Sequence, residues 1–337
     1  MLPGQAQNTP RDSEAKRCCS FCEASTICGA LPRIRVMNQP ASLESSSPLL
    51  FDTLAIVGVG LLGGSVARAA KQRGLVRRII GVGRNAARLE SARTAGVIDV
   101  AETSLTQAAS QADLLIFATP VDRIVAGVRE AAAACRVGTI LTDVGSTKGH
   151  LCRELATGLP TYVTFIGSHP LAGSEKQGWE HSLSDLFDGR VCVVTPVSET
   201  SGSEQSASVS RLTHFWQRMG MRVIELSPEA HDRALAQTSH VPHVVASALA
   251  RTLEESNRSF AATGFADTTR IAAGDPDVWV PILLDNSAAI LASLDDYSQQ
   301  LQAFREALTA RDADTLHRLW DHGKAVRDSI RIRRVAN

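Results

Sequence analysis

A glycine-rich turn suited to binding phosphate lies at residues 58–65. The residues Gly58-Val-Gly60-Leu61-Leu62-Gly63 match the pattern G-x-G-x-x-G, and they join a β-branched run to a helical stretch. In this position Gly58 permits a tight turn, Gly60 lets a pyrophosphate approach the backbone, and Gly63 allows close packing of helix on strand. The turn therefore predicts a site for a dinucleotide.

The choice of dinucleotide depends on the end of the next predicted strand, Ile79–Val82. An acidic residue there would bind the ribose 2′-hydroxyl of NAD. This sequence has Gly83 at that place, followed by Arg84, and a guanidinium suits a 2′-phosphate. We expect the protein to use NADP or NAD, with NADP use suggested by Gly83 and Arg84. The predicted cofactor-binding residues are Gly58, Gly60, Leu61, Leu62, Gly63, Arg84, Thr119 and Pro120.

Two further polar motifs follow predicted strands. Asp143-Val-Gly-Ser146-Thr-Lys148 ends one strand, and Gly167-Ser-His169-Pro-Leu-Ala-Gly-Ser174-Glu175 follows the next. Ligands of open α/β sheets bind outside the carboxyl ends of the strands. We therefore expect both motifs to face the ligand. Asp143 and Lys148 can equally be residues that cap and begin a helix.

Alternating short strands and helices must position these motifs. Strands are predicted at 54–58, 78–82, 113–119 and 139–143, with helices at about 62–73, 86–95 and 121–134. Such alternation indicates βαβ units and a parallel sheet. Residues 165–168, 191–195 and 222–226 are predicted to be later strands of that sheet. The fold class is thus an α/β Rossmann-like nucleotide-binding domain, residues 51–226.

The strand signals stop after Ser227-Pro228, a pair typical of a helix start. Residues 227–332 are predicted to form an all-α helical domain for substrate binding and dimerisation, broken near Gly264, Gly274–Pro276 and Arg311-Asp312. Apolar residues repeat there with spacings of four and three, which favours packing against another helix, within the subunit or between two subunits. These residues are Ile290, Leu294, Tyr297, Leu301, Phe304 and Leu308.

The N-terminal stretch, residues 1–50, shows no sustained periodicity and is rich in Ser, Pro, Arg and Gln. We expect a disordered extension, or one that arises from an upstream start assignment with Met37 as the alternative start. Cys19 and Cys22 form a C-x-x-C pair, but no second pair follows at zinc-site spacing, so no metal is predicted. The seven cysteines show no disulfide framework, which favours a reducing, cytoplasmic location.

The composition of the chain limits the classes of binding partner that are expected. Thirty-five basic residues balance 35 acidic ones, so long-range attraction to nucleic acid or to a membrane surface is not expected. Aromatic residues make up only 4%, which disfavours stacking platforms for single-stranded nucleic acid. The longest apolar stretch stops at Arg68 and falls short of the ~20 residues that span a bilayer. A small-molecule substrate is therefore the expected partner.

Taken in order along residues 53–330, five motifs resemble those of the prephenate/arogenate dehydrogenase family of tyrosine biosynthesis. The first three are the glycine turn and the two strand-end motifs described above. Two more lie in the helical part, Ser239-His240-Val-Pro-His243 and Gly264-Phe-Ala-Asp267-Thr-Thr-Arg270. The resemblance implies an NAD(P)-dependent oxidative decarboxylation of a cyclohexadienyl substrate in a homodimer joined through the helical domain.

The resemblance also implies a role for each site residue. His169 is the catalytic histidine, and its ordinary pKa of ~6.5 allows the neutral ring to accept a hydroxyl proton. Ser146 is its catalytic partner, bonding either His169 or the substrate. Arg270 is the clamp for a substrate carboxylate. The remaining substrate-pocket positions are Ser174, Ser239, His240 and His243. The histidines outside these motifs, His231 among them, are expected to be surface or core residues.

The sequence leaves alternative hypotheses for the substrate and for the class of protein. Prephenate, which would give 4-hydroxyphenylpyruvate, and arogenate differ in one keto or amino group, and the residues do not choose between them. A β-hydroxyacid dehydrogenase shares the domain order but needs a catalytic lysine, and residues 229–330 contain only Lys324. A non-catalytic dinucleotide-binding protein would have lost His169, Ser146 or Arg270. His240 and His243, three residues apart, could also ligate a metal, but no carboxylate or cysteine completes that site.

Overall fold

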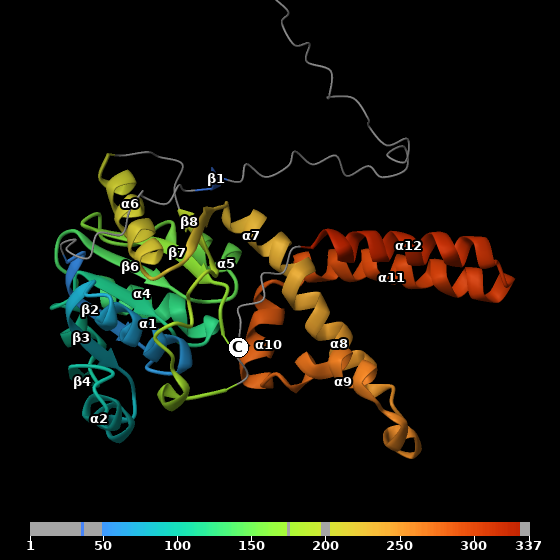
Figure 1. The fold of residues 1–337 in the computed structure, drawn as a ribbon. Helices are drawn as coiled ribbons and strands as arrows, with labels where there is room; N and C mark the ends of the chain where they lie inside the picture. The colour runs from blue at the N-terminus through green and yellow to red at the C-terminus, as the bar shows by residue number, and fades with distance from the viewer. Residues whose placement is uncertain (1–34, 37–48, 174–175, 197–202, 331–337) are drawn as a thin grey trace, which may run out of the picture. The chain divides into compact units, whose positions relative to one another are not determined.

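The computed structural model describes residues 35–36, 49–173, 176–196 and 203–330, which Figure 1 shows as coloured ribbon. Within these residues nine strands form one sheet in the order β1-β9-β8-β7-β6-β5-β2-β3-β4. The strands are β1 (Arg35–Val36), β2 (Phe51–Val57), β3 (Val76–Val82), β4 (Val100–Glu102), β5 (Leu114–Phe117), β6 (Thr139–Asp143), β7 (Val163–Pro170), β8 (Val191–Pro196) and β9 (Arg222–Glu225).

Helices cover both faces of this sheet (Figure 1). They are α1 (Leu61–Gln72), α2 (Ala86–Thr94), α3 (Leu105–Ala109), α4 (Ile124–Ala132), α5 (Gly149–Leu155) and α6 (Ser203–Arg218), with short 3₁₀ turns η1 (Val121–Arg123) and η2 (Trp179–His181). Successive residues of a strand point to opposite faces. Leu54 therefore packs in the core with α1, α2 and α6, while Ala55 packs in the core with α3, α4 and α5. This is the doubly wound α/β arrangement expected from the alternating elements.

The predicted parallel pairing holds for most of the sheet but not for one side of it. Strands β2 to β7 pair in parallel, but β7 pairs antiparallel with β8, with His169 opposite Val193. A parallel neighbour needs a crossover that returns the chain to the opposite edge, usually through a helix. In its described residues the connection from β7 to β8 contains only η2, so the chain enters β8 from the edge where β7 ends. Strand β9 then pairs in parallel with β8.

The part of the chain after β9 is helical in its described residues. It comprises α7 (Pro228–Leu235), the π-helical turn η3 (Ala236–His240), α8 (Val241–Arg251), η4 (Glu255–Phe260), α9 (Thr263–Thr269), η5 (Arg270–Ala273), α10 (Pro276–Asp285), α11 (Ser287–Ala310) and α12 (Ala313–Ser329). Helix α7 begins as predicted, because the Ser227 side chain accepts a bond from the Ala230 amide and Pro228 occupies the first turn. Helices α11 and α12 lie side by side (Figure 1).

All three predicted helix breaks are confirmed. Pro276 begins α10, and Arg311 separates α11 from α12 in a left-handed conformation with φ of 55°. The break near Gly264 lies just before it, because residues 261–262 are not helical and α9 begins at Thr263. Along α11 the apolar repeat is divided: Ile290 is buried, while Leu301 and Leu308 are exposed.

Two residues of the stretch predicted to contain no packed element form β1, which pairs antiparallel with β9 through Arg35–Glu225 and Val36–Ile224. The rest of residues 1–48, with its C-x-x-C pair, lies outside the described residues. Among the described helices, none alone has the length and hydropathy needed to cross a bilayer. Helices α10 and α11 reach those values only as a pair, and they meet at a 90° bend.

Candidate functional site

A cavity of about 950 Å³ opens at the carboxyl edge of the parallel strands. Its walls come from the turns after β2, β3, β5 and β6, and from α10 of the helical part through Val278 and Ile282. Of the predicted cofactor residues, all but Gly63 line it: Gly58, Gly60, Leu61, Leu62, Arg84, Thr119 and Pro120. Ser146 lines it too. The fold therefore brings the glycine turn and one predicted catalytic residue into one space.

The glycine turn has the shape that a pyrophosphate requires. Gly58 has a φ of 98°, and a Cβ atom on it would lie 2.7 Å from the Ala118 carbonyl oxygen. A Cβ on Gly63 would lie 2.1 Å from the Gly58 carbonyl oxygen, whereas one on Gly60 would meet nothing within 4 Å. Among the residues that the structure describes, no side chain caps the start of α1. The free amides of that helix end and the open side of Gly60 suit a dinucleotide phosphate.

The far end of the cavity is lined by Gly83, Arg84 and Arg88. A Cβ on Gly83 would rest against Leu89 at 3.6 Å, an ordinary contact, so space does not forbid a side chain there. Arg84 is exposed, and Arg88 lies 3.9 Å from Glu180. This end of the cavity therefore has glycine at position 83, where an acidic residue would bind the ribose of NAD, and it has two cationic side chains, Arg84 and Arg88.

The buried side chain of Lys148 fixes the loop after β6 by hydrogen bonds to it. Its fully buried ammonium donates to Asp143 Oδ2 at 2.6 Å and to the carbonyl oxygens of Gly145 at 2.7 Å and Thr147 at 3.0 Å. Burial raises the pKa of Asp143, while Lys148 and the amides of Gly145 and Ser168 oppose that shift. Ser146 lies between the two clamped carbonyl groups. Lys148 precedes α5, so it both starts a helix and fixes the Ser146 backbone.

His169 lies near the end of β7, is only 9% exposed, and is not among the described residues that line the cavity. Its Nδ1 is 2.9 Å from Nε2 of His231, and the rings are tilted at 59°. Burial lowers the pKa of His169 well below its ordinary value, and His231, Lys148 and His240 lower it further. The ring is therefore neutral at physiological pH. Among the described residues no hydrogen bond joins His169 and Ser146, so the suggested bond between them is not present.

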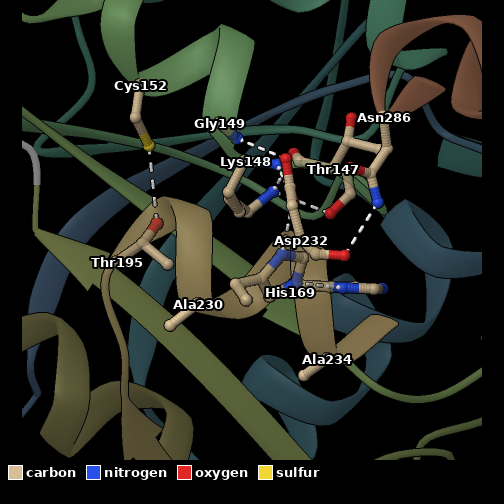
Figure 2. Close-up of polar contacts among 12 residues, drawn as sticks. Thr147, Lys148, Gly149, Cys152, His169, Thr195, Ala230, Asp232, Ala234 and Asn286 are labelled. Carbon is tan, nitrogen blue, oxygen red and sulfur yellow. Dashed lines mark hydrogen bonds and ion pairs between the residues drawn. The ribbon is translucent and has the colours of Figure 1, made fainter. Parts of the chain in front are cut away.

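Asp232 connects several elements around His169, as Figure 2 shows. Its Oδ1 accepts from His231 Nδ1 at 2.8 Å and from the Lys148 amide at 2.8 Å, and its Oδ2 accepts from the Gly149 amide at 2.7 Å. Burial alone would raise the pKa of Asp232, but these hydrogen bonds outweigh it and the pKa is lowered. Asp232 is therefore a carboxylate, and it binds the start of α5 to α7.

The π-helical turn η3 and the start of α8 present Ser239, His240 and His243. Asn286 Nδ2 donates to the Asp232 carbonyl oxygen at 2.8 Å and to His240 Nδ1 at 3.1 Å. The remaining nitrogen of His240, Nε2, is buried and has no partner among the described residues. His243 Nδ1 donates to the Ser239 carbonyl oxygen at 2.8 Å, and its ring stacks on Trp279 at 3.6 Å. π-Helical turns often occur at functional sites.

None of the described residues that were predicted to bind substrate lines the cavity: Arg270, Ser239, His240 and His243 are all outside its walls. Arg270 is exposed on η5 and does not line the cavity. Burial is the main cause of the lowered pKa of His243, and the charge of Arg270 lowers it further. No ion pair within the described residues joins Arg270 to Asp267, the carboxylate of the same motif. Ser174 lies outside the described residues. Beside that gap, Gln177 lines the cavity and donates to the carboxylate of Asp275, at the start of α10.

Sequence reasoning missed the residues that support His169. His231 was assigned to surface or core, and Asp232 and Asn286 were not singled out, yet all three are buried and hydrogen-bonded around the site. The only local signal is the adjacent pair His231-Asp232 one turn into a capped helix. No group of three or more His, Cys, Asp or Glu residues in the described chain could hold a metal ion.

Comparison with known proteins agrees with this geometry. Residues 66–225 match the family described as "Prephenate dehydrogenase, nucleotide-binding domain", and residues 227–322 match "Prephenate dehydrogenase, dimerization domain". The chain is 33% identical to prephenate dehydrogenase of Bacillus subtilis, over 84% of this chain and 77% of that protein. It is 31% identical to cyclohexadienyl dehydrogenase of Zymomonas mobilis, over 79% and 92% of the two chains.

Solved structures give the same result. Prephenate dehydrogenase from Aquifex aeolicus, in complex with hydroxyphenyl propionate and NAD+, superposes with a TM-score of 0.76 at 30% identity, covering 84% of this chain and 98% of that one. Arogenate dehydrogenase from Synechocystis superposes with a TM-score of 0.68 at 28% identity, covering 82% and 99%. With both of its domains matched and the glycine turn, Ser146 and His169 gathered at one edge of the sheet, the chain belongs to the prephenate dehydrogenase family.

Proposed function

We propose that this chain is an NAD(P)-dependent prephenate dehydrogenase, which converts prephenate to 4-hydroxyphenylpyruvate and carbon dioxide in tyrosine biosynthesis. The observation that carries the proposal is the single cavity in which the glycine turn meets Ser146 and α10 of the helical part. Arogenate is the alternative substrate, because relatives of comparable similarity are named cyclohexadienyl and arogenate dehydrogenases. The two substrates differ in a keto or amino group on the side chain carried by the ring carbon that loses its carboxylate.

The residues present fit a nicotinamide dinucleotide. The open amides at the start of α1, with Gly58 and Gly60, would hold its pyrophosphate, and Thr119 and Pro120 would border the nicotinamide half. When bound, the cofactor supplies the acceptor for a hydride from the ring carbon that bears the hydroxyl group. Proton transfer and substrate binding are assigned to side chains of the protein.

His169 is the proposed base. It accepts the hydroxyl proton while the ring carboxylate leaves as carbon dioxide, and it returns that proton to the oxygen once the ring is aromatic. The lowered pKa of His169 keeps the ring neutral before substrate binds, which a base requires. Ser146 is proposed to bond the substrate, because its backbone is fixed at the cavity wall.

The helical part is proposed to bind the substrate's carboxylates. The Nε2 atom of His240 is buried and has no partner in the described part of the chain. It needs a ligand, since leaving it unbonded costs about 1–3 kcal/mol. Arg270 is proposed as a carboxylate clamp, and its charge already acts on His243. Ser239, His243 and Ser174 are the other proposed contacts.

A cytoplasmic homodimer is the proposed working form. Its support is the match of residues 227–322 to a family described as a dimerization domain. Large apolar side chains are also exposed on α10, α11 and α12, among them Leu284 at 71%, Leu291 at 61% and Trp320 at 73%. Burial of such side chains against a second copy would remove them from water.

The function is tested by incubating the purified protein with prephenate or arogenate and either cofactor, and following the near-ultraviolet absorbance of the reduced nicotinamide. We expect turnover with prephenate, and kcat/KM at least about tenfold lower with arogenate, a difference of about 1.4 kcal/mol in transition-state binding. A greater kcat/KM with arogenate would show that arogenate, and not prephenate, is the preferred substrate. No turnover with either would refute the proposed function.

NADP is proposed as a usable and preferred cofactor because of Gly83 and Arg84. Replacement of Arg84 by alanine is expected to lower kcat/KM for NADP about tenfold, since a hydrogen bond to a charged group contributes about 1.5–3 kcal/mol. The value for NAD should change by less than about threefold, because the 2′-hydroxyl carries no charge.

The matched control for this variant is Arg129→Ala, an exposed arginine that pairs with Glu154; neither of the two lines the cavity. It should leave both cofactors unaffected. A strong preference of the unmodified protein for NAD, or an equal loss for both cofactors in Arg84→Ala, would refute the proposed role of Arg84.

A further inference from the structure

Three buried side chains from the two halves of the chain form a continuous line of hydrogen bonds. Asp232 Oδ1 is 2.8 Å from His231 Nδ1, and His231 Nε2 is 2.9 Å from His169 Nδ1. His169 belongs to β7 of the nucleotide-binding half, while His231 and Asp232 belong to α7, the first helix of the helical part. Each of the three residues is less than 10% exposed.

The hydrogen atoms in this line can be placed from its fixed end. Asp232 Oδ1 and Oδ2 already accept bonds from the amides of Lys148 and Gly149, so Asp232 is a carboxylate that can only accept. His231 must then donate from Nδ1, and since burial keeps its pKa low the ring is neutral and its Nε2 carries a lone pair. His169 must therefore donate from Nδ1, which leaves the lone pair of His169 on Nε2.

The line is rigid because each member is held from another element. Asp232 is tied to the start of α5 by two backbone amides, and its own carbonyl oxygen accepts from Asn286, between α10 and α11. The Ser227 cap and Pro228 fix the first turn of α7, one turn before His231. Strand pairing with β8 fixes the backbone of His169. The tautomer of His169 is thus set by the docking of α7 against the sheet.

We propose that His231, oriented by Asp232, is a positioning residue that fixes His169 in the tautomer with a bare Nε2 and stabilises the positive charge on His169 after proton transfer. The inference rests on the proposed function, in which His169 Nε2 takes the substrate's hydroxyl proton. No covalent bond forms or breaks in the line itself. The arrangement has the same logic as a carboxylate that holds a catalytic histidine in its working tautomer, with a second imidazole placed between them.

The first test needs no turnover. Nitrogen NMR of protein containing labelled histidine distinguishes the protonated from the bare nitrogen of a neutral ring, and the His169 signals are assigned by their loss in His169→Asn. At neutral pH we expect His169 to be neutral and protonated at Nδ1. A neutral His169 protonated at Nε2, or an even mixture of the two forms, would refute the proposal.

The second test compares two substitutions of His231. Leucine removes the acceptor for His169, so His231→Leu should lower kcat about 100-fold and leave KM within about threefold. Glutamine can accept from His169 through its carbonyl oxygen and donate to Asp232 through its amide, so His231→Gln should recover at least about tenfold of that loss. A His231→Leu variant that binds the dinucleotide normally and keeps wild-type kcat would overturn the inference.

These two tests separate the inference from the function on which it rests. If unmodified protein oxidises neither prephenate nor arogenate, the proposed function fails, and the NMR result still decides the tautomer of His169. If the protein turns over but His231→Leu and His231→Gln lose equal activity, a purely structural role of His231 replaces the proposed one.

Discussion

Replacing His169 with asparagine is expected to lower kcat by about 10²–10⁴-fold, the usual contribution of a positioned general base. The dissociation constant of the dinucleotide should stay within about twofold, because His169 is not among the described residues lining the cavity. Initial rates measured at saturating substrate and cofactor, with cofactor binding measured separately by titration, test both expectations.

The physical reason is that asparagine keeps a polar side chain of similar size but cannot accept a proton at physiological pH. In the native protein, burial and the nearby His231, Lys148 and His240 keep the pKa of His169 well below its ordinary value. The ring is therefore ready to take a proton. After the substitution, the hydroxyl proton would have to leave to water, from which the buried site is largely shielded.

The matched control is His181→Asn, which changes an exposed histidine in the turn η2. It should leave kcat within about twofold of the native value, the range expected for a side chain that takes no part in the reaction. If His169→Asn behaved like His181→Asn, the assignment of the base would be wrong. Loss of cofactor binding in the His169 variant would instead indicate a structural role.

Replacing Lys148 with methionine is expected to lower the free energy of unfolding by about 3–5 kcal/mol, the cost of leaving one member of a buried ion pair alone. Lys148 and Asp143 are both fully buried, with 2.6 Å between Nζ and Oδ2. The ammonium also binds the carbonyl oxygens of Gly145 and Thr147, which would lose their partner. Denaturant unfolding at a fixed protein concentration measures the loss.

Two controls sharpen this prediction. Lys71→Met breaks an ion pair with Asp99 that is partly exposed, and it should cost no more than about 1 kcal/mol. The double variant Asp143→Leu, Lys148→Met removes both charges and should be more stable than Lys148→Met alone, because no unpaired charge stays buried. Equal stability of Lys148→Met and Lys71→Met would contradict the clamp attributed to Lys148.

The elements around the glycine turn could be predicted from sequence because their signals are local. The strand at 139–143 and the helix start at Ser227-Pro228 depend on β-branched runs and capping residues within a few positions. Helix α6 and strand β4 were not predicted, because their sequences carry weak local signals. The first half of α6 is rich in serine, and only Leu212, Phe215 and Trp216, buried against the sheet, reveal its amphipathic face. Strand β4 is too short to show a period.

The antiparallel pairing of β8 could not be read from its residues. A run such as Val191–Thr195 has the same composition in either direction, and the direction is set by the long connection that follows His169. That connection stays at the edge of the sheet where the cavity lies, and Gly173, Lys176, Gln177 and Gly178 from it line the cavity. The connection between β7 and β8, which makes β8 antiparallel to β7, thus also contributes to the candidate site.

Motifs identified the side chains that are proposed to face the ligand, but they did not identify the residues that hold them. His169 and Ser146 stand in patterns of neighbouring residues, whereas His231 is 62 residues from His169 and Asp232 is 83 from Gly149. Such contacts appear only when α7 packs against the sheet. Arg270 remains a proposal for the opposite reason, because its motif is clear but its exposed position on η5 does not reach the cavity.

The central claim is that oxidation of the ring alcohol and loss of the ring carboxylate are one reaction at the edge formed by the glycine turn, Ser146 and His169. Its most direct test is the simultaneous measurement of reduced nicotinamide, carbon dioxide and aromatic product from prephenate in one reaction mixture. The account predicts equal amounts of all three at every time point. Reduced cofactor without carbon dioxide, or carbon dioxide without reduced cofactor, would contradict it.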